Sequence, residues 1–344
     1  MKKTQFALAA LALVASTAAL ADGVTVYGNL DAGIANQNSG AGTALRGTFA
    51  EGNWNGGSAF GLRGSEDLGG GLKAGFTLES GFKMNDGTMA NGGTIPTLDG
   101  SATTTQGFFN RQANISLSGD FGTLTVGQQL NQYIAGALGT NLPNAAFGAF
   151  TVGSIINGAN GGIAGGFFTP NAITYAMPTI GGLNAAIQTQ LKGSGADANS
   201  MTSLSASFAV SDISVSAGYI DRSSVHQAYT IGASMPIGAV TLNLRYTTSD
   251  PTGATKSTNQ IAGGVAYALS EGVTLSLQHA DNSGASSAKL TNLAAHYALS
   301  KTTGVYAMYS MASNGAGMFY SGGATNTTTD TSNSGIAVGV NKSF

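Results

Sequence analysis

Short segments in which every second residue is apolar run through most of this chain. In VTLNLRYTT (240–248) the apolar Val, Leu, Leu and Tyr alternate with Thr, Asn, Arg and Thr. The segments GVTLSLQHA (272–280) and LKAGFTLESGF (72–82) keep the same period. A period of two is that of a β-strand, whose side chains point alternately to its two faces. The chain is therefore predicted to form strands with one apolar face and one polar face.

The segments that separate these strands come in two sizes. Seven are short turns, such as EDLGGG (66–71) and LSEG (269–272), and eight are longer loops rich in Gly, Ser, Asn and Thr, including 36–57 and 130–168. Alternating turns and loops of these numbers predict sixteen strands, with both chain ends on the short-turn side. The strands are placed at about 23–35, 58–65, 72–83, 108–118, 122–129, 169–177, 183–192, 201–210, 213–222, 226–235, 239–249, 258–269, 272–281, 287–298, 304–312 and 333–344.

The composition decides the class of sheet protein. Charged residues make up 9% of the chain, against roughly 25% in soluble domains. After residue 21 no run of about 18 apolar residues could form a membrane-spanning helix. Alternation with few charges is typical of a transmembrane β-barrel, whose strands face lipid on one side and the lumen on the other. Such a barrel has short periplasmic turns and long external loops.

A barrel in lipid has to close, because an open sheet edge would leave backbone amides without partners. The chain ends in GIAVGVNKSF (335–344), which alternates like the earlier strands and finishes on the aromatic Phe344. We expect this last strand to pair with VTVYGNLDAGI (24–34) and close the cylinder. Phe344 would then lie in the aromatic girdle at the periplasmic rim.

The first 21 residues differ from the rest of the chain. MKKTQFALAALALVASTAALA has two lysines, an apolar run and a small-residue end, which is the pattern of a cleaved secretory signal peptide. A membrane-spanning helix is the alternative, but the run is short and rich in alanine. We therefore expect residues 1–21 to be removed and 22–344 to form the barrel.

The mature chain carries few groups for chemistry or for nucleic acid. It has 12 basic and 16 acidic residues, a net charge of −4, and no basic tract, so nucleic acid is not an expected partner. It has no cysteine, which excludes disulfides and thiolate chemistry. The protein is expected to depend on backbone pairing and side-chain packing alone.

Several longer stretches resemble the general porins of Gram-negative outer membranes, in particular the type common in β-proteobacteria. They are VTVYGNLDAGI (24–34), FGLRGSEDLGGGLKAGFTLESGF (60–82), FFNRQANISLSGDFGTLTVGQQ (108–129), PNAITYAMPTIGGLNAAIQ (170–188) and the terminal Phe344. The resemblance implies a homotrimer of sixteen-stranded antiparallel barrels, with a third external loop folded into the lumen. It also implies contact with outer-membrane lipid and lipopolysaccharide, and insertion by the barrel-assembly machinery.

The chain departs from this family where the pore would be narrowest. Porins of this type set acidic residues of the third loop across from a cluster of bases on the wall. The corresponding loop here, 130–168, contains no Asp, Glu, Lys, Arg or His. Two positions where the family carries a base are Asn29 and Ala59, and Arg111 alone matches the basic wall. The resemblance therefore implies the fold, whereas the loop lacks the acidic half of the family's usual transverse field.

Two arguments place the side chain of Arg111 on opposite sides of the wall. Local alternation groups it with Phe109, Ala113 and Ile115, which would point it outward. The resemblance points it into the lumen. A lipid-facing arginine at mid-depth costs about 2–4 kcal/mol, so we expect the lumen. A β-bulge, or a strand whose outer face lies in a subunit contact, would reconcile the two.

The candidate pore-lining residues lie mainly on the predicted water-facing sides of the strands. They are Asn29, Asp31, Ala59, Arg63, Lys73, Glu79, Lys83, Arg111, Arg222 and Arg245. Phe344 is the candidate for barrel closure and assembly.

No motif favours an enzyme, a metal or a cofactor. His226, His279 and His296 lie on different predicted strands, without another His, Asp or Glu at ligand spacing. The run NGANGGIAGG (157–166) lacks the Lys-Ser or Lys-Thr of a phosphate-binding loop. Its glycines are better explained as letting a long loop fold tightly against a wall.

The predicted function is passive diffusion of ions and small hydrophilic solutes through a water-filled channel in the outer membrane. Two alternatives from other classes remain. A plugged barrel would serve surface binding or structure, with the loop 130–168 filling the bore. An outer-membrane hydrolase would need a Ser, His and Asn or Asp grouping, which the sequence does not display.

Overall fold

The computed structural model describes residues 22–39, 45–51, 54, 56–89, 107–142, 167–191, 200–222, 226–251, 257–284, 287–313 and 333–344. The expected signal peptide, residues 1–21, lies outside this part of the chain. The described strands form one sheet. They are β1 (Asp22–Ser39), β2 (Leu45–Glu51), β3 (Ala59–Gly69), β4 (Leu72–Gly81), β5 (Gln112–Gly119), β6 (Gly122–Leu130), β7 (Phe168–Ala176), β8 (Leu183–Gln190), β9 (Met201–Val210), β10 (Ile213–Arg222), β11 (His226–Ile237), β12 (Val240–Pro251), β13 (Thr258–Ser270), β14 (Val273–Gly284), β15 (Lys289–Ser300), β16 (Thr303–Ser313) and β17 (Asn333–Ser343).

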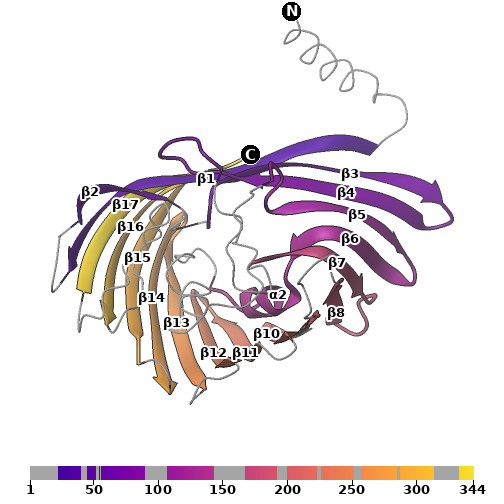
Figure 1. Cartoon of the computed structure of the whole chain (residues 1–344). Coiled ribbons are helices and arrows are strands. Elements are labelled where there is room, and N and C mark those ends of the chain that lie inside the picture. Colours follow the sequence, from indigo (N-terminus) through magenta and orange to yellow (C-terminus); the bar gives the residue numbers. More distant parts are fainter. Residues whose placement is uncertain are drawn as a thin grey trace, which may run out of the picture.

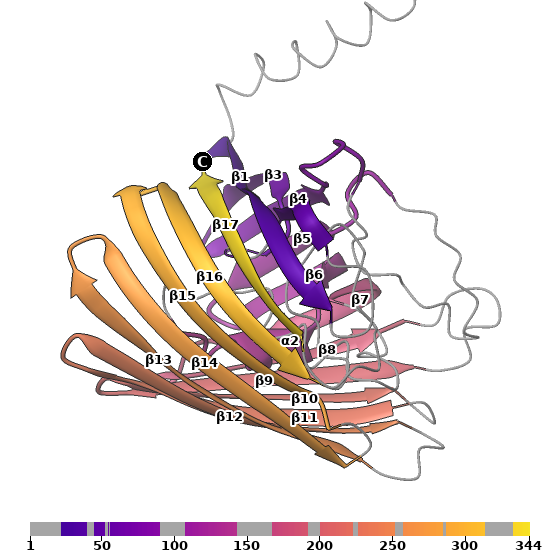
Figure 2. The ribbon, with the colours of Figure 1, turned by 90° about the vertical axis from the view of Figure 1, so that its left-hand side faces the viewer.

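The sheet closes into a barrel between its first and last strands. β1 and β17 run antiparallel, with Asn29 opposite Ser343 and Ser39 opposite Asn333. Beyond this ladder, Gly28 and Phe344 exchange two backbone hydrogen bonds of 3.0 Å each. Figure 2 shows the two strands side by side. The predicted closure by the C-terminal segment is confirmed, and no edge of the wall is left unpaired at this seam.

The barrel wall has sixteen strand positions but seventeen strand segments. β2 and β3 lie one after the other in the same position beside β1. β2 pairs with β1 at Ala32–Gln37, and β3 pairs with β1 at Asp22–Asn29. The loop predicted over 36–57 was therefore wrong for residues 45–51. β1 continues to Ser39, four residues past the predicted strand end. Its added amides and carbonyls need a partner, and β2 supplies one.

The break between β2 and β3 folds against the inside of the wall. Trp54 donates its backbone N–H to Asp31 Oδ2 at 2.6 Å, and the Tyr306 hydroxyl donates to Asp31 Oδ1 at 2.7 Å. The Trp54 ring stacks on His296 with 4.6 Å between centroids. These contacts hold the interrupted strand against β15 and β16, and the sequence did not predict them.

The two faces of the wall follow the predicted alternation. On β12, Leu242 and Leu244 are exposed on the outer face, while Arg245 is buried on the inner face. On β14, Leu277 is exposed and Gln278 is buried. Apolar groups thus cover the outside and polar groups the inside. Within the described residues, no α-helix is long and apolar enough to cross a bilayer.

A short helix, α2 (Gln132–Leu138), lies inside the barrel directly after β6 (Figure 1). It begins at Asn131, whose side chain accepts a hydrogen bond from the Tyr133 N–H at 2.9 Å. It packs mainly against β9, β10 and β11. The inward third loop is confirmed for its described part, 130–142, whereas 143–166 lie outside the described residues. The helix itself was not predicted, because seven residues hold too few turns for a helical period to be recognised.

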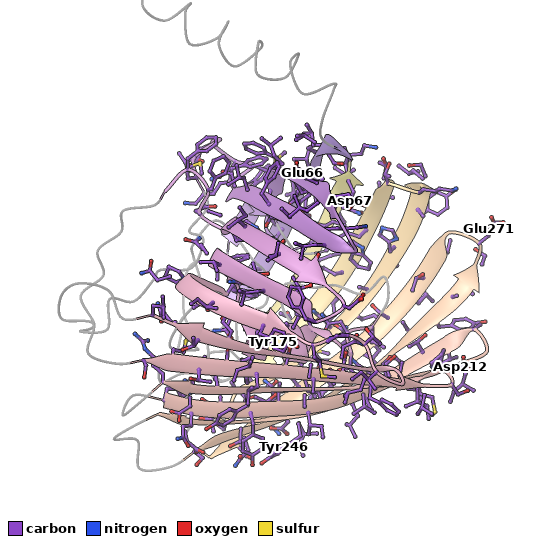
Figure 3. All side chains as sticks on the ribbon, turned by 90° about the vertical axis from the view of Figure 1, so that its right-hand side faces the viewer. Glu66, Asp67, Tyr175, Asp212, Tyr246 and Glu271 are labelled. Atoms are coloured by element: carbon purple, nitrogen blue, oxygen red, sulfur yellow. The ribbon has the colours of Figure 1, made fainter. Side chains whose placement is uncertain are left out.

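The two ends of the barrel differ in the length of the connections between strands. The short turns gather at one end, where Figure 3 labels Glu66, Asp67, Asp212 and Glu271. The strand ends that precede and follow the longer connections, such as Ser39 of β1 and Ser313 of β16, lie at the other end. The short-turn rim thus carries these four carboxylates, and the first residue of β1 and the last residue of β17 lie at the same end.

Candidate functional site

The polar wall formed by β1, β3, β4 and β5 is built from cross-strand rows. Directly paired residues point to the same face of a sheet. Thr25, Arg63, Thr77 and Asn114 make one such row, since each is opposite the next. The reverse side of these strands carries exposed apolar groups such as Val26 and Ile115. These rows therefore lie on the inner face of the barrel.

One row towards the long loops, an ion pair crosses this wall. Gly61, Glu79 and Gln112 are opposite one another there, and the Glu79 carboxylate pairs with the Arg111 guanidinium. Glu79 also accepts a hydrogen bond from the Tyr27 hydroxyl at 2.8 Å. The Arg111 charge is thus balanced by a carboxylate that is itself fixed in place.

Arg111 reaches this position because it lies outside the regular strand. β5 begins at Gln112, so the strand predicted over 108–118 starts four residues later. Arg111 and Gln112 are neighbours in sequence, yet both side chains contact Glu79. The guanidinium carbon also lies 4.9 Å from the centre of the Phe168 ring. Local alternation therefore does not apply to Arg111, whose side chain turns to the inner face.

Arg63 and Lys73 are the exposed bases of this wall. Arg63 lies over the Tyr27 ring, with 4.9 Å from its guanidinium carbon to the ring centre. Lys73 follows the turn at Gly69–Leu72 and is opposite Asp67. The Asp67 carboxylate accepts the Gly69 N–H at 2.8 Å. Among the described residues, no carboxylate lies within 4 Å of either base.

A recess of about 380 Å³ opens between these two bases. Its floor is a row of small residues, Ser65, Gly75 and Ser116, which are opposite one another. Hydroxyls of Thr25, Thr77 and Ser118 also line it. The recess therefore combines two positive charges with several hydroxyl groups and contains no bulky side chain at its floor.

Arg222 and Arg245 lie on the inner face across the barrel but are covered. Each is 4% exposed. Arg245 donates from Nη1 to the Ala137 carbonyl near the end of α2 at 3.1 Å. Arg222 is opposite His226, whose Nε2 lies 2.6 Å from the Ser249 hydroxyl. Little of the surface of these two arginines meets solvent, and their predicted place as pore-lining residues stays a prediction.

The remaining candidates at the break in the second wall strand are also enclosed. Asn29 donates to the Gly57 carbonyl at 3.2 Å, and Ala59, opposite it, is 1% exposed. Asp31 is fully buried and accepts the Trp54 and Tyr306 hydrogen bonds described above. These residues hold the Trp54 segment.

Lys83 lies past the end of β4, in a turn where its N–H donates to the Thr88 carbonyl at 2.7 Å. In the same turn the Thr88 hydroxyl donates to the Asp86 carboxylate and lowers the pKa of that group. Lys83 is therefore outside the regular wall, and its predicted place in the lumen stays a prediction.

The comparison of the chain with known protein families agrees with this architecture. A family model described as Gram-negative porin matches residues 7–317, which is most of the chain. The chain belongs to the Gram-negative porin family. The predicted family and its outer-membrane location are confirmed.

Individual porins resemble the chain over different extents. Outer membrane porin protein 32 of Delftia acidovorans is 36% identical over 193 residues, 54% of this chain and 48% of that protein. The major outer membrane protein P.IB of Neisseria meningitidis is 37% identical over 131 residues, 37% of this chain and 34% of that protein. The matches thus span about half or less of the length of these curated relatives.

The solved porins confirm the barrel along nearly the whole chain. An anion-selective porin from Comamonas acidovorans has a TM-score of 0.78 and 26% identity, covering 94% of this chain and 99% of that one. The outer membrane protein OmpT of Vibrio cholerae, solved in a trimer form, has a TM-score of 0.67 at 13% identity and covers 94% of this chain and 99% of that one. The second likeness is one of fold alone.

The three histidines of this porin lie in separate surroundings, and that of His226 beside Ser249 is described above. His279 is exposed on the outer face, with Nδ1 2.8 Å from the Thr291 hydroxyl. His296 is buried between the Trp54 ring and Asn341. In the described part of the chain, no three His, Asp or Glu side chains gather as metal ligands would.

Three aromatic residues of the inner wall were missed by the sequence analysis. Tyr27 connects Glu79 to Arg63, and Trp54 and Tyr306 enclose Asp31. Tyr27 could have been found, because it lies between Thr25 and Asn29 on the polar side of VTVYGNLDAGI. Trp54 could not, because its segment has no alternating pattern.

Proposed function

We propose that this porin forms a water-filled channel through which ions and small hydrophilic solutes diffuse passively across the outer membrane. The observation that carries the proposal is the inner wall of β1, β3, β4 and β5. It presents the exposed Arg63 and Lys73 to a polar recess, inside a closed barrel with an apolar exterior. Water and ions are stable beside such a wall, whereas lipid is stable outside it.

The proposed mechanism is size exclusion without catalysis. α2 lies inside the barrel against β9, β10 and β11, where it would narrow the bore from one side. Solutes would pass between α2 and the opposite wall, where Arg111 is paired with Glu79. The short-turn end would face the periplasm and the long loops the exterior, as in other outer-membrane barrels.

Single-channel conductance of the purified protein in planar bilayers tests this function. We expect discrete, ohmic conductance steps at 1 M KCl. A plugged barrel that served only surface binding would give no steps, and that outcome would contradict the proposal. Heat-modifiable migration on gels, measured on the same sample, separates a folded but closed barrel from a misfolded one.

We further propose that the protein is a homotrimer exported with residues 1–21 as a cleaved signal peptide. A solved neighbour of the same fold occurs in a trimer form. Lipid, lipopolysaccharide and the barrel-assembly machinery would be its other partners. Native gels before and after heating, with mass spectrometry of the mature N-terminus, test the trimer and the cleavage together. A monomer that retains residues 1–21 would contradict both.

Phe344 is proposed to direct assembly of the closing strand. Its backbone pairs with Gly28 and its side chain is 53% exposed at the short-turn rim. Deleting Phe344, or the change Phe344→Asp, should leave export across the inner membrane intact and block folding in the outer membrane. Quantifying the heat-modifiable protein in outer-membrane fractions measures this, with Val340→Leu as the control. A normal level of folded Phe344→Asp would refute the assembly function.

A further inference from the structure

The bases on the described inner wall differ in how much charge they offer to a passing ion. Arg222 and Arg245 are 4% exposed. Arg111 is paired with Glu79, which is buried beside it. Arg63 and Lys73 are exposed and have no carboxylate within 4 Å among the described residues. The accessible positive charge of this wall is therefore concentrated at Arg63 and Lys73.

The register places these two bases on either side of one floor. Ser65 and Gly75 are opposite each other, with Arg63 two residues before Ser65 and Lys73 two residues before Gly75. Because the strands are antiparallel, the bases lie on opposite sides of this row. They are four residues apart along the strands, or about 13 Å at 3.3 Å per residue. Both line the same recess of about 380 Å³.

The floor of the recess brings hydroxyl groups close to the lumen surface. Gly75 has no side chain, and a methyl group built there would already lie 2.8 Å from the Ser116 hydroxyl oxygen. Ser65, Thr77, Ser116 and Ser118 provide hydroxyl groups around it. A hydroxyl donates to an anion as readily as it does to water. The described lining includes the apolar Ala74 and Phe76 and no acidic residue.

The donor set favours oxyanions over simple halides. A guanidinium presents several N–H groups in a plane and matches two oxygens at once, while an ammonium group acts as a compact point charge. The Tyr27 ring beneath Arg63 restricts the guanidinium without neutralising it. Several oxygens of one anion can thus be bound by Arg63, Lys73 and the hydroxyls together.

We propose that the recess between Arg63 and Lys73 is a binding site for small oxyanions, carrying phosphate or carboxylate groups, and that it makes the channel prefer anions. The proposal rests on the channel function above. Binding is weak and reversible, because the site is open to the lumen and conduction requires release as well as entry. The site lies just inside the short-turn rim. An anion that enters at this rim passes the rim carboxylates first and then meets the site, and an anion that leaves here meets them in the reverse order.

The test compares wild type with Arg63→Gln/Lys73→Gln in planar bilayers. The first readout is the reversal potential in a tenfold KCl gradient around 0.1 M, where the Debye length is about 10 Å. The second is inhibition of the chloride current by inorganic phosphate. We expect the chloride-to-potassium permeability ratio to fall at least twofold in the variant. The phosphate concentration for half-inhibition should rise at least threefold.

A matched control removes two positive charges from the same end of the barrel without touching the recess. Lys301 lies in the β15–β16 turn, and Lys342 on β17 is exposed and donates to the Thr302 hydroxyl at 2.7 Å. Lys301→Gln/Lys342→Gln should keep the wild-type permeability ratio and phosphate inhibition. An equal change in this control would overturn the site, because it would assign selectivity to net charge at the rim.

The remaining outcomes separate the site from the channel function. Absence of conductance in wild type would contradict the channel itself. Conducting wild type and variant with equal permeability ratios would overturn the inference and leave the channel function standing. A lower permeability ratio with unchanged phosphate inhibition would also overturn the oxyanion site. Wild-type circular dichroism and heat-modifiability of the variant keep a folding defect from being read as a loss of binding.

Discussion

Arg245 and Arg63 are two arginines on the inner face of one barrel, and their surroundings are opposite. Arg245 is 4% exposed and donates to the Ala137 carbonyl of α2. Arg63 is exposed beside a recess and rests on the Tyr27 ring. The first fastens a helix to the wall, while the second offers its charge to the lumen. The face to which a side chain points therefore does not decide its function. What decides it is whether a segment distant in sequence packs over that side chain.

The largest expected effect comes from placing a third arginine on the other side of the wall. Leu244 precedes Arg245, is 61% exposed on the outer face and lies near the middle of β12. Leu244→Arg should lower the free energy of unfolding by about 2–4 kcal/mol, because the guanidinium would face lipid. Urea unfolding in lipid vesicles measures it. Thr241→Arg, on the inner face, is the control, and equal losses would mean that the assigned faces are wrong.

The two arginines themselves provide the next test. Arg245→Met removes the donor to the Ala137 carbonyl and leaves that acceptor without it. The free energy of unfolding should fall by about 1.5–3 kcal/mol, the range for hydrogen bonds to charged groups. Arg63→Met should change it by less than about 0.5 kcal/mol, as for other exposed positions. Equal losses of unfolding free energy in Arg245→Met and Arg63→Met would show that the covered and the open wall do not differ in this way. Urea unfolding measures both.

The same contrast applies to two glycines. A methyl group added at Gly218 would lie 2.5 Å from the Tyr133 carbonyl oxygen of α2, whereas at Gly75 the nearest atom is the Ser116 hydroxyl, which can rotate away. Gly218→Ala should cost about 1–3 kcal/mol through overpacking. It should also push α2 into the bore and reduce single-channel conductance. Gly75→Ala should leave both the stability and the conductance nearly unchanged.

Gly218→Ala with wild-type conductance would show that α2 does not narrow the bore. Conversely, a large loss of stability in Gly75→Ala would show that the floor of the recess is more tightly packed than the open wall described here.

The smallest expected effect concerns the ion pair between the two regions. Arg111→Gln leaves the negative charge of Glu79 without a balancing positive charge, so the reversal potential should shift towards cation preference. Glu79→Gln/Arg111→Gln removes both charges and should give a smaller shift than the single change. Reversal potentials in a tenfold KCl gradient measure both. A shift in Arg111→Gln larger than that in Arg63→Gln/Lys73→Gln would mean that Arg111, and not Arg63 with Lys73, sets the selectivity.

The alternation of the sequence was enough to predict the barrel. It assigned Leu242 and Leu277 to the outside and Arg245 and Gln278 to the inside, and it predicted the seam at Phe344. These features depend on strand periodicity, which is a local property of the sequence, and on the need to pair every strand edge, which holds for any barrel.

The sequence could not predict which inner residues are accessible. Arg111 contacts Glu79, 32 residues away, and Arg245 contacts Ala137, 108 residues away. Asp31 and Tyr306 meet across 275 residues. A period of two assigns a side chain to a face, but burial and pairing on that face depend on these distant partners. The sequence therefore assigned the candidate residues to a face, but it could not give their exposure or their partners.

The docking of α2 also orders the events of folding. The hydrogen bonds that fasten it join Gly136 to Ser216 and Ala137 to Arg245, which are 80 and 108 residues apart. The helix is synthesised after β6, yet the wall that receives it is completed only when β10 and β12 are paired. Contacts this far apart are slow to form, because the intervening chain must be ordered first. A barrel arrested before β12 would therefore lack the Arg245 hydrogen bond that fastens the end of this helix to the wall.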